Sequence, residues 1–343
     1  MRKLLNTLYV TTPETYLSLD GENVVVLKEE ETLLRVPLHN LDGIVAFGYR
    51  GASPALMGAC VGRGISLSFC SPFGRFLAKV VGEPRGNVVL RRTQYRVADD
   101  ELESVRVARN MLIGKLHNSR WVLERATRDY SQRLDTVRLK KTAGFLMESI
   151  TRLQGAQTHG VLMGIEGEAA SMYFSVFDEL ILQNKDKFFF RERSRRPPMD
   201  NVNALLSFVY VLLANDTTAA ASTVGLDPFV GFLHKDRPGR RSLALDIMEE
   251  LRAPLADRFV LTLINTKRID AIGFEQKENG SVFMRDDARK ILLNAWQERK
   301  SEQIIHPFLK EKVEWGLVPY VQALLLARFL RGDLDAYPPF LWK

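Results

Sequence analysis

The sequence predicts an α+β fold, in which a β-rich N-terminal domain precedes a larger all-α domain. Up to about residue 92 the chain consists of short apolar runs separated by glycines, a pattern typical of strands and turns. After Asp99 and Asp100 glycines become rare, and apolar residues recur three and four positions apart, as on one face of a helix. A chain of 343 residues that is 46% hydrophobic has enough material for two buried cores. We therefore expect a β-rich domain over residues 1–92, a linker over 93–100 and a helical domain over 101–343.

The first domain opens with a predicted hairpin over residues 15–28. Its first run alternates apolar and polar residues, Asp20 and Gly21 form the turn, and a β-branched run follows. Between Phe47 and Ser66 the segment SPALMGACVG predicts a short helix, so the strands on its two sides should pair in parallel. Further strands are expected at Leu33 to Pro37, Gly43 to Phe47, Ser66 to Phe69 and Phe76 to Val81.

The rest of the chain is predicted to be helical. Leu102, Val105, Ala108, Met111, Leu112 and Leu116 mark one apolar helix face. Pro197-Pro198 and the segment from Gly225 to Gly239 should interrupt the helices without creating new domains. The longest apolar stretch, Ala204 to Ala214, has eleven residues, about half of the ~20 that span a bilayer. We expect it to be a buried core helix, and we expect no membrane contact.

Composition favours a cytoplasmic protein with a polyanionic partner. Forty-eight Lys and Arg residues against forty-one Asp and Glu residues leave a net charge of +7, which makes nucleic acid the leading candidate partner. Cys60 and Cys70 are too few for a disulfide scaffold, form no zinc-ligand pattern and should be buried. The N-terminal segment shows no export signal. Motifs for nucleotide-driven or acyl-transfer chemistry are absent from the sequence.

The segment from Gly164 to Ile181 separates two glutamates. On a helical wheel Glu166 lies near the centre of the stripe formed by Ala169, Ala170, Tyr173, Val176, Phe177 and Leu180, whereas Glu168 lies on the polar side. A carboxylate that points into an apolar interface needs a raised pKa, a cation or a metal ion. Glu166 is therefore either a metal ligand, the partner of a buried arginine, or a residue of a fraying first turn.

The segment from Gly225 to Asp257 supplies a histidine and two further carboxylates. His234 follows an apolar run and begins a basic loop, and Asp246 and Glu249 lie one helical turn apart. Ser242 is the expected N-cap of this helix, whose buried face is formed by Ala244, Ile247, Met248, Leu251 and Leu255, while Asp246, Glu249 and Glu250 occupy the other arc. The cations of the loop, which would receive phosphates, are Lys235, Arg237, Arg240 and Arg241.

These residues allow two interpretations. An imidazole and carboxylates can hold a divalent ion, and a Glu/His/Glu set suits Mn²⁺ or Mg²⁺ better than structural zinc, although imidazole is an unusual ligand for Mg²⁺. Alternatively, the histidine is structural, the acidic arc is solvated, and Glu249 forms a routine pair with Arg252.

A second basic segment, KDKFFFRERSRR from Lys185 to Arg196, has six positive and two negative charges around three phenylalanines. Arginines and aromatic rings together can hold a nucleic-acid backbone and stack on an unpaired base. The predicted contacts are Lys187, Arg191, Arg193, Arg195 and Arg196. The alternative is a basic helix end and loop whose phenylalanines lie in the core.

Four blocks, in this order and spacing, resemble the CRISPR-associated adaptation integrase family, the first and most widespread of the Cas proteins. The blocks are GIEGEAASMYF from Gly164, RRPPMDNVNALLSFVY from Arg195, GLDPFVGFLH from Gly225 and RRSLALDIMEELR from Arg240. The resemblance covers essentially the whole chain. It implies that Glu166, His234 and Glu249 bind a metal ion, Mn²⁺ or Mg²⁺, and that Asp246 is a supporting catalytic carboxylate.

The resemblance also implies a function and partners. Family members insert captured foreign DNA as new spacers into a CRISPR array, by attack of a 3′-hydroxyl on a phosphodiester. The implied DNA is double-stranded and partly single-stranded. The family further implies a prokaryotic cytoplasmic homodimer, joined through the β-rich domain and bridged by the small second Cas protein. Two rival functions stay open: a metal-dependent nuclease for branched DNA, and a non-catalytic DNA-binding assembly protein.

Overall fold

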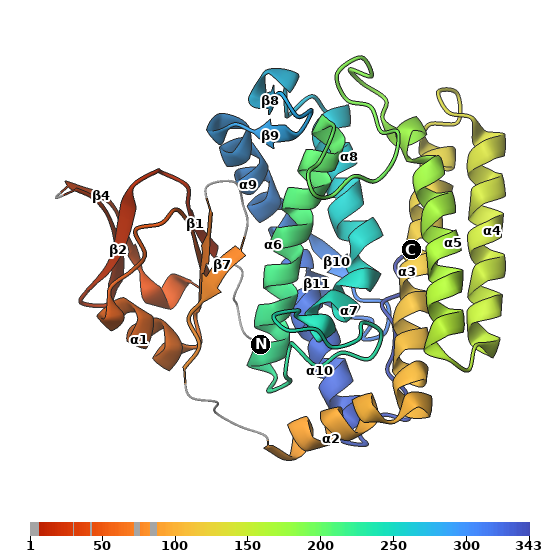
Figure 1. Ribbon diagram of the computed structural model, residues 1–343, viewed down its shortest axis with the longest axis horizontal. Coiled ribbons are helices and arrows are strands. Elements are labelled where there is room, and N and C mark those ends of the chain that lie inside the picture. Colours follow the sequence, from red (N-terminus) through yellow and green to blue (C-terminus); the bar gives the residue numbers. More distant parts are fainter. Residues whose placement is uncertain (1–6, 30, 42, 72–75, 83–87) are drawn as a thin grey trace. The chain divides into compact units, whose positions relative to one another are not determined.

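The computed structural model describes residues 7–343 except 30, 42, 72–75 and 83–87 (Figure 1). The chain divides into two compact units, residues 1–86 with 284–302, and residues 87–283 with 303–343. The predicted order, a β-rich part followed by a mostly helical part, is confirmed. Residues 93–100, expected as a linker, belong instead to helix α2 (Val88–Asp99) and to Asp100, the N-cap of helix α3. The expected division of roles between the domains stays a prediction.

The first unit contains two sheets. Strands β2 (Thr15–Asp20), β3 (Asn23–Lys28) and β4 (Glu31–Pro37) form an antiparallel sheet, which confirms the predicted hairpin. Strands β1 (Thr7–Val10), β5 (Gly43–Phe47), β6 (Ser66–Cys70) and β7 (Phe76–Lys79) form the other sheet in that order. Strands β5 and β6 are parallel, as the helix expected between them requires.

Helix α1 (Pro54–Arg63) is that expected connection. Ser53 caps it by accepting a hydrogen bond from the Leu56 backbone N–H, and Pro54 occupies the first helical position, where its missing N–H costs nothing. Leu17, Ile44, Leu56 and Leu67 are fully buried in the core of this unit. Cys60 and Cys70 are buried, as predicted. Helix α9 (Asp286–Ser301) also belongs to the first unit.

In the second unit, three long antiparallel helices pack side by side (Figure 1). They are α3 (Glu101–Asp129), α4 (Thr136–Gly155) and α5 (His159–Ser175). Each begins at a polar N-cap, Asp100, Asp135 or Thr158, whose side chain accepts a backbone N–H of the first turn. The 3₁₀ turn Phe177–Leu180 follows α5. Helices α3 and α5 supply one side of the site described below.

Helices α6 (Asn201–Thr223) and α7 (Ser242–Leu251) form the opposite side with the π-helical turn Arg252–Asp257 and helix α8 (Arg258–Asn265). Helix α6 is longer than the apolar run that predicts it, and its length and composition alone would suit a membrane span. However, 72% of its most apolar stretch is buried inside the protein, which is typical of the core helix that we expected.

Shorter elements complete the second unit. Helix α10 (Val318–Leu330) packs on α6 and α7. Two short strand pairs follow, β8 (Phe274–Gln276) with β9 (Val282–Met284) and β10 (Gln303–Ile305) with β11 (Lys312–Glu314). The 3₁₀ turns are Ala271–Gly273, Trp315–Leu317 and, in the first unit, Leu38–Asn40.

Candidate metal centre

The loop that precedes α7 carries His234 and is fixed from two directions. From α2, the fully buried Gln94 side chain donates to the carbonyl oxygens of Asp227 and Val230, both at 2.8 Å, and accepts the Asp227 N–H at 2.9 Å. The expected linker thus contributes an anchor for the site. From α7, the loop approaches so closely that a Cβ atom on Gly231 would lie 2.6 Å from Asp246 Oδ2, so only glycine fits there.

Asp246 organises the end of this loop. Its fully buried carboxylate accepts the backbone N–H groups of Phe232, Leu233 and His234 at 2.6, 2.9 and 3.0 Å. The same carboxylate lies 2.6 Å from Nδ1 of His234. Because an ionised carboxylate only accepts, Nδ1 must carry the hydrogen, which leaves the lone pair on Nε2. Asp246 therefore fixes the orientation of the His234 ring, and both of its own oxygens are used by groups of the loop.

One expectation and one alternative for α7 are wrong. Ser242 is the first helical residue, not the N-cap, and its hydroxyl donates to the Lys235 carbonyl at 3.3 Å. The alternative of a solvated acidic arc is also wrong, because Asp246, Glu249 and Glu250 are each at most 3% exposed. Glu250 accepts hydrogen bonds from the Tyr337 hydroxyl and the Phe340 backbone N–H of the C-terminal segment, and burial raises its pKa to about 8. Tertiary packing covers the polar arc that local spacing assigns to water.

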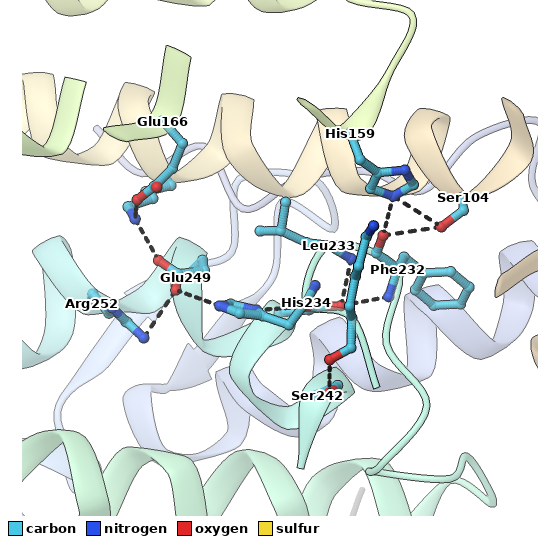
Figure 2. A network of polar contacts seen from close by, with 12 residues as sticks. Ser104, His159, Glu166, Phe232, Leu233, His234, Ser242, Glu249 and Arg252 are labelled. Carbon is cyan, nitrogen blue, oxygen red and sulfur yellow. Dashed lines mark hydrogen bonds and ion pairs between the residues drawn. The ribbon is translucent and has the colours of Figure 1, made fainter. Parts of the chain in front are cut away.

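Glu249 is the centre of the charged cluster (Figure 2). Its Oε1 lies 4.0 Å from His234 Nε2 and 2.9 Å from Arg252, and its Oε2 lies 2.7 Å from Lys115 Nζ. The ammonium of Lys115, from α3, also pairs with Glu166 from α5. Burial alone would raise the pKa of Glu249, but the positive charges of Arg252 and Lys115 outweigh it and lower the pKa to about 2. Glu249 is therefore an anion at neutral pH despite its burial.

The three predicted ligands, Glu166, His234 and Glu249, border one charged cluster, because Lys115 pairs with both glutamates and His234 Nε2 lies 4.0 Å from Glu249 Oε1. The donor set fits a divalent cation, since it offers two carboxylates and an imidazole nitrogen whose tautomer Asp246 already fixes. In the part of the chain that the structure describes, no three donors are close enough to share an ion in the present arrangement. The ammonium of Lys115 lies between the two glutamates and pairs with both of them. The wheel argument on α5 is confirmed, because Glu168 is 56% exposed and pairs with Arg152.

The π-helical turn extends the cluster away from the ligands. Arg252, its first residue, stacks over the Tyr210 ring at 5.1 Å, and Asp257, its last, accepts the hydroxyls of Tyr210 and Tyr173 at 2.6 and 3.1 Å. Burial raises the pKa of Asp257 to about 6. Single π turns recur at functional sites. In this turn, Arg252 at one end contacts Glu249, and Asp257 at the other end contacts Tyr173 of α5.

A clamp on the other side of His234 could not be predicted from the sequence. Nε2 of His159, the first residue of α5, lies 2.7 Å from the Phe232 carbonyl oxygen, and the Ser104 hydroxyl donates to the same oxygen at 3.0 Å (Figure 2). No spacing in the sequence connects these residues. Lys115 leaves a signal that could have been read, because it is a cation directly beside the apolar stripe of Leu112 and Leu116.

The predicted DNA-contact residues separate into two groups. Arg193 donates to Asn203 Oδ1 at 2.6 Å and to the Ser207 hydroxyl, and Arg241 donates to Asn215 Oδ1 at 2.9 Å. Both arginines are partly buried and bind side chains of the protein, and their contact with nucleic acid stays a prediction. The others lie at or near the surface, and Arg195 lines the same pocket as Glu166 and Lys115. This surface set is Lys187, Arg191, Arg195, Arg196, Lys235, Arg237 and Arg240. Phe188 and Phe190 are buried in the core, and Phe189 is exposed beneath Arg191.

Comparison with known proteins identifies the family. Residues 8–298 match the family model described as CRISPR associated protein Cas1. The chain belongs to the Cas1 family. Two relatives, named CRISPR-associated endonuclease Cas1 1 from Chlorobaculum tepidum and CRISPR-associated endonuclease Cas1 2 from Rhodospirillum rubrum, are each 50% identical over the full length of both chains. The resemblance read from the four sequence blocks is thereby confirmed.

Solved structures establish the Cas1 fold for the chain. The Cas1 protein TM1797 from Thermotoga maritima has a TM-score of 0.82 and 21% identity, and the match covers 95% of this chain and 97% of that one. A casposase bound to integration product has a TM-score of 0.84 at 21% identity, with 98% and 93% covered. At these identities the likeness concerns the fold alone.

Proposed function

We propose that this Cas1-family chain is a metal-dependent DNA integrase and endonuclease that inserts captured foreign DNA into a CRISPR array. The observation that carries the proposal is the convergence of Glu166, Glu249 and Nε2 of His234, which Asp246 holds in the ligating tautomer. The relatives named endonucleases support cleavage of nucleic acid, and the casposase with its integration product supports strand transfer.

The residues of the chain have distinct parts in this reaction. Glu166, His234 and Glu249 would hold Mn²⁺ or Mg²⁺, which supplies Lewis-acid stabilisation of the charge that develops on the phosphoryl oxygens. Asp246 orients the imidazole, and the surface cations bind the DNA backbone, Arg195 nearest to the ligands. The 3′-hydroxyl of the incoming fragment gives up its proton and attacks the phosphorus, so that a new phosphodiester bond forms. The bond between the phosphorus and the 3′-oxygen of the cleaved strand breaks, and this oxygen takes up a proton and becomes a 3′-hydroxyl.

The proposed partners follow from the family. We infer a cytoplasmic homodimer, joined through the β-rich part, that binds double-stranded DNA with single-stranded ends and associates with the small second Cas protein. The association with the second Cas protein is supported by a solved structure of similar fold, a Cas6-RT-Cas1–Cas2 complex. Its TM-score is 0.82 and its sequence identity is 23%.

Half-site integration into a supercoiled plasmid that contains the repeat tests the proposal. With Mn²⁺ the protein should join a labelled fragment with a 3′-hydroxyl to the plasmid, whereas a fragment with a 3′-terminal dideoxynucleotide should not be joined. Glu166→Gln should abolish joining, and Glu168→Gln is the matched control, since Glu168 lies on the exposed side of the same helix. Cleavage of branched DNA without joining would support the rival nuclease. Joining that survives Glu166→Gln would exclude the proposed site.

A further inference from the structure

We propose that Lys115 is an internal counter-cation that takes the place of the divalent ion while the site is empty and must leave when the ion binds. The inference rests on the proposed function and adds a residue that controls how tightly the site binds its metal. It is carried by one contact pattern: the Lys115 ammonium is paired with both proposed carboxylate ligands, Glu166 and Glu249, at once.

The pairing explains how two carboxylates from distant elements can coexist in a largely buried place. The side chain of Glu249 is 4% exposed, that of Glu166 is 18% exposed and that of Lys115 is 14% exposed. Two like charges held together away from water repel each other strongly, and a buried ammonium without partners is also costly. Lys115 lies between them on α3 and satisfies both glutamates with one charge. Among the ion pairs of the described residues, Arg252 pairs with Glu249 and not with Glu166, so it does not bridge the two glutamates as Lys115 does.

The ammonium and the metal ion exclude each other on distance alone. A Mg²⁺ ion binds carboxylate oxygens at about 2.0–2.1 Å. Nζ of Lys115 lies 2.7 Å from Glu249 Oε2 and is also in contact with Glu166 Oε1. An ion that bound both of these oxygens would therefore occupy the volume of the ammonium. Two cations cannot share that volume, so ion binding must break both ion pairs.

The surroundings allow the lysine side chain to move. Lys115, Glu166 and Arg195 line one pocket that is partly open to solvent, and this pocket continues between α3 and α5. The flexible four-carbon stem of lysine can turn into such a space, whereas a rigid guanidinium would move less readily. Every metal-binding event then includes the cost of releasing Lys115, which lowers the apparent affinity of the site for metal.

Titration of the full-length protein with Mn²⁺ alone, with free Mn²⁺ measured by electron paramagnetic resonance, tests this inference. Lys115→Met keeps the length of the side chain and removes its charge. We expect Lys115→Met to bind Mn²⁺ at least tenfold more tightly than the unchanged protein, equivalent to about 1.4 kcal/mol. Lys115→Arg, which keeps the charge, should not tighten binding. Lys141→Met, an exposed position on α4, is the matched control and should bind as the unchanged protein does.

A second readout guards against a variant that merely folds poorly. Without metal, Lys115→Met should melt at a lower temperature, and saturating Mn²⁺ should raise its melting temperature by more than it raises that of the unchanged protein. Equal or weaker Mn²⁺ binding by a folded Lys115→Met protein would overturn the role of Lys115 but leave the metal site intact. If neither protein binds Mn²⁺ in a manner that depends on Glu166, the proposed function itself fails, and this inference fails with it.

Discussion

Replacement of Asp246 by asparagine tests the central geometric argument, because the two side chains have nearly the same shape. The carboxylate accepts four hydrogen bonds, from three backbone N–H groups and from Nδ1 of His234. Each oxygen accepts two of the four. An asparagine amide turns one oxygen into a donor, so two donors lose their acceptor in either orientation. At about 1–3 kcal/mol for each buried unsatisfied group, Asp246→Asn should destabilise the protein by about 2–6 kcal/mol.

The substitution should also weaken metal binding. Loss of the acceptor at Nδ1 frees His234 to place its hydrogen on Nε2, which then cannot bind an ion. Residues that hydrogen-bond to a metal ligand typically contribute about 10–100-fold to metal affinity or activity, and we expect a loss in this range for Asp246→Asn. Glu249→Gln removes a proposed ligand and should cost more activity.

Thermal unfolding, Mn²⁺ titration and half-site integration should be measured together on Asp246→Asn. Asp236→Asn is the matched control, because Asp236 lies in the same loop and is exposed. The reasoning is refuted if Asp246→Asn melts and binds Mn²⁺ as the control does. An activity loss equal to that of Glu249→Gln, with unchanged stability, would instead make Asp246 a direct ligand.

Three further predictions concern the surroundings of the site. His159→Ala removes one of the two side chains that hold the Phe232 carbonyl oxygen, and we expect about 1 kcal/mol of lost stability by chemical denaturation together with slower integration; unchanged integration would show that His159 is not needed. Replacement of both Arg195 and Arg196 by alanine should lower the slope of log affinity for DNA against log salt by about 1–2, given ~0.9 per phosphate contact, and an unchanged slope would assign both a structural role. Burial lowers the pKa of His306 from 6.5 to about 4. Its contribution to stability is therefore complete above pH 6.5 and is lost as the pH falls toward 4, so the denaturation free energy should decline over that window, and less steeply in His306→Asn.

Burial is the main reason why the pKa of His306 is low, and the contacts of the ring suit its neutral form. Nε2 contacts Gln322 Oε1 at 3.1 Å, and Nδ1 accepts the Leu309 backbone N–H at 3.3 Å. A neutral ring satisfies both contacts, with its hydrogen on Nε2. A second hydrogen on Nδ1 would face the Leu309 N–H, which disfavours the charged ring in the folded protein.

Local spacing was sufficient for much of the fold and for the choice of ligand candidates. Alternation around Asp20-Gly21 gave the hairpin, and the segment between two β-branched runs gave α1 and a parallel strand pair. The helical wheel over α5 separated Glu166 from Glu168. A helix buries one side, and the spacing of its apolar residues shows which side that is. The resemblance to a family then connected Glu166 with His234 and Glu249, which spacing alone could not do.

Only the tertiary structure decided how these groups act on each other. Lys115 meets Glu166 and Glu249 across 51 and 134 residues of chain, respectively, and neither pairing leaves a local pattern. The C-terminal segment covers Glu250, and Asp246 and Glu249 are buried as well, so the alternative of a solvated acidic arc is wrong. Arg193 sits in a charge-rich surface motif yet bonds inward to Asn203. Periodicity records the burial of apolar side chains along one element, whereas the pairing of charges depends on which elements pack together.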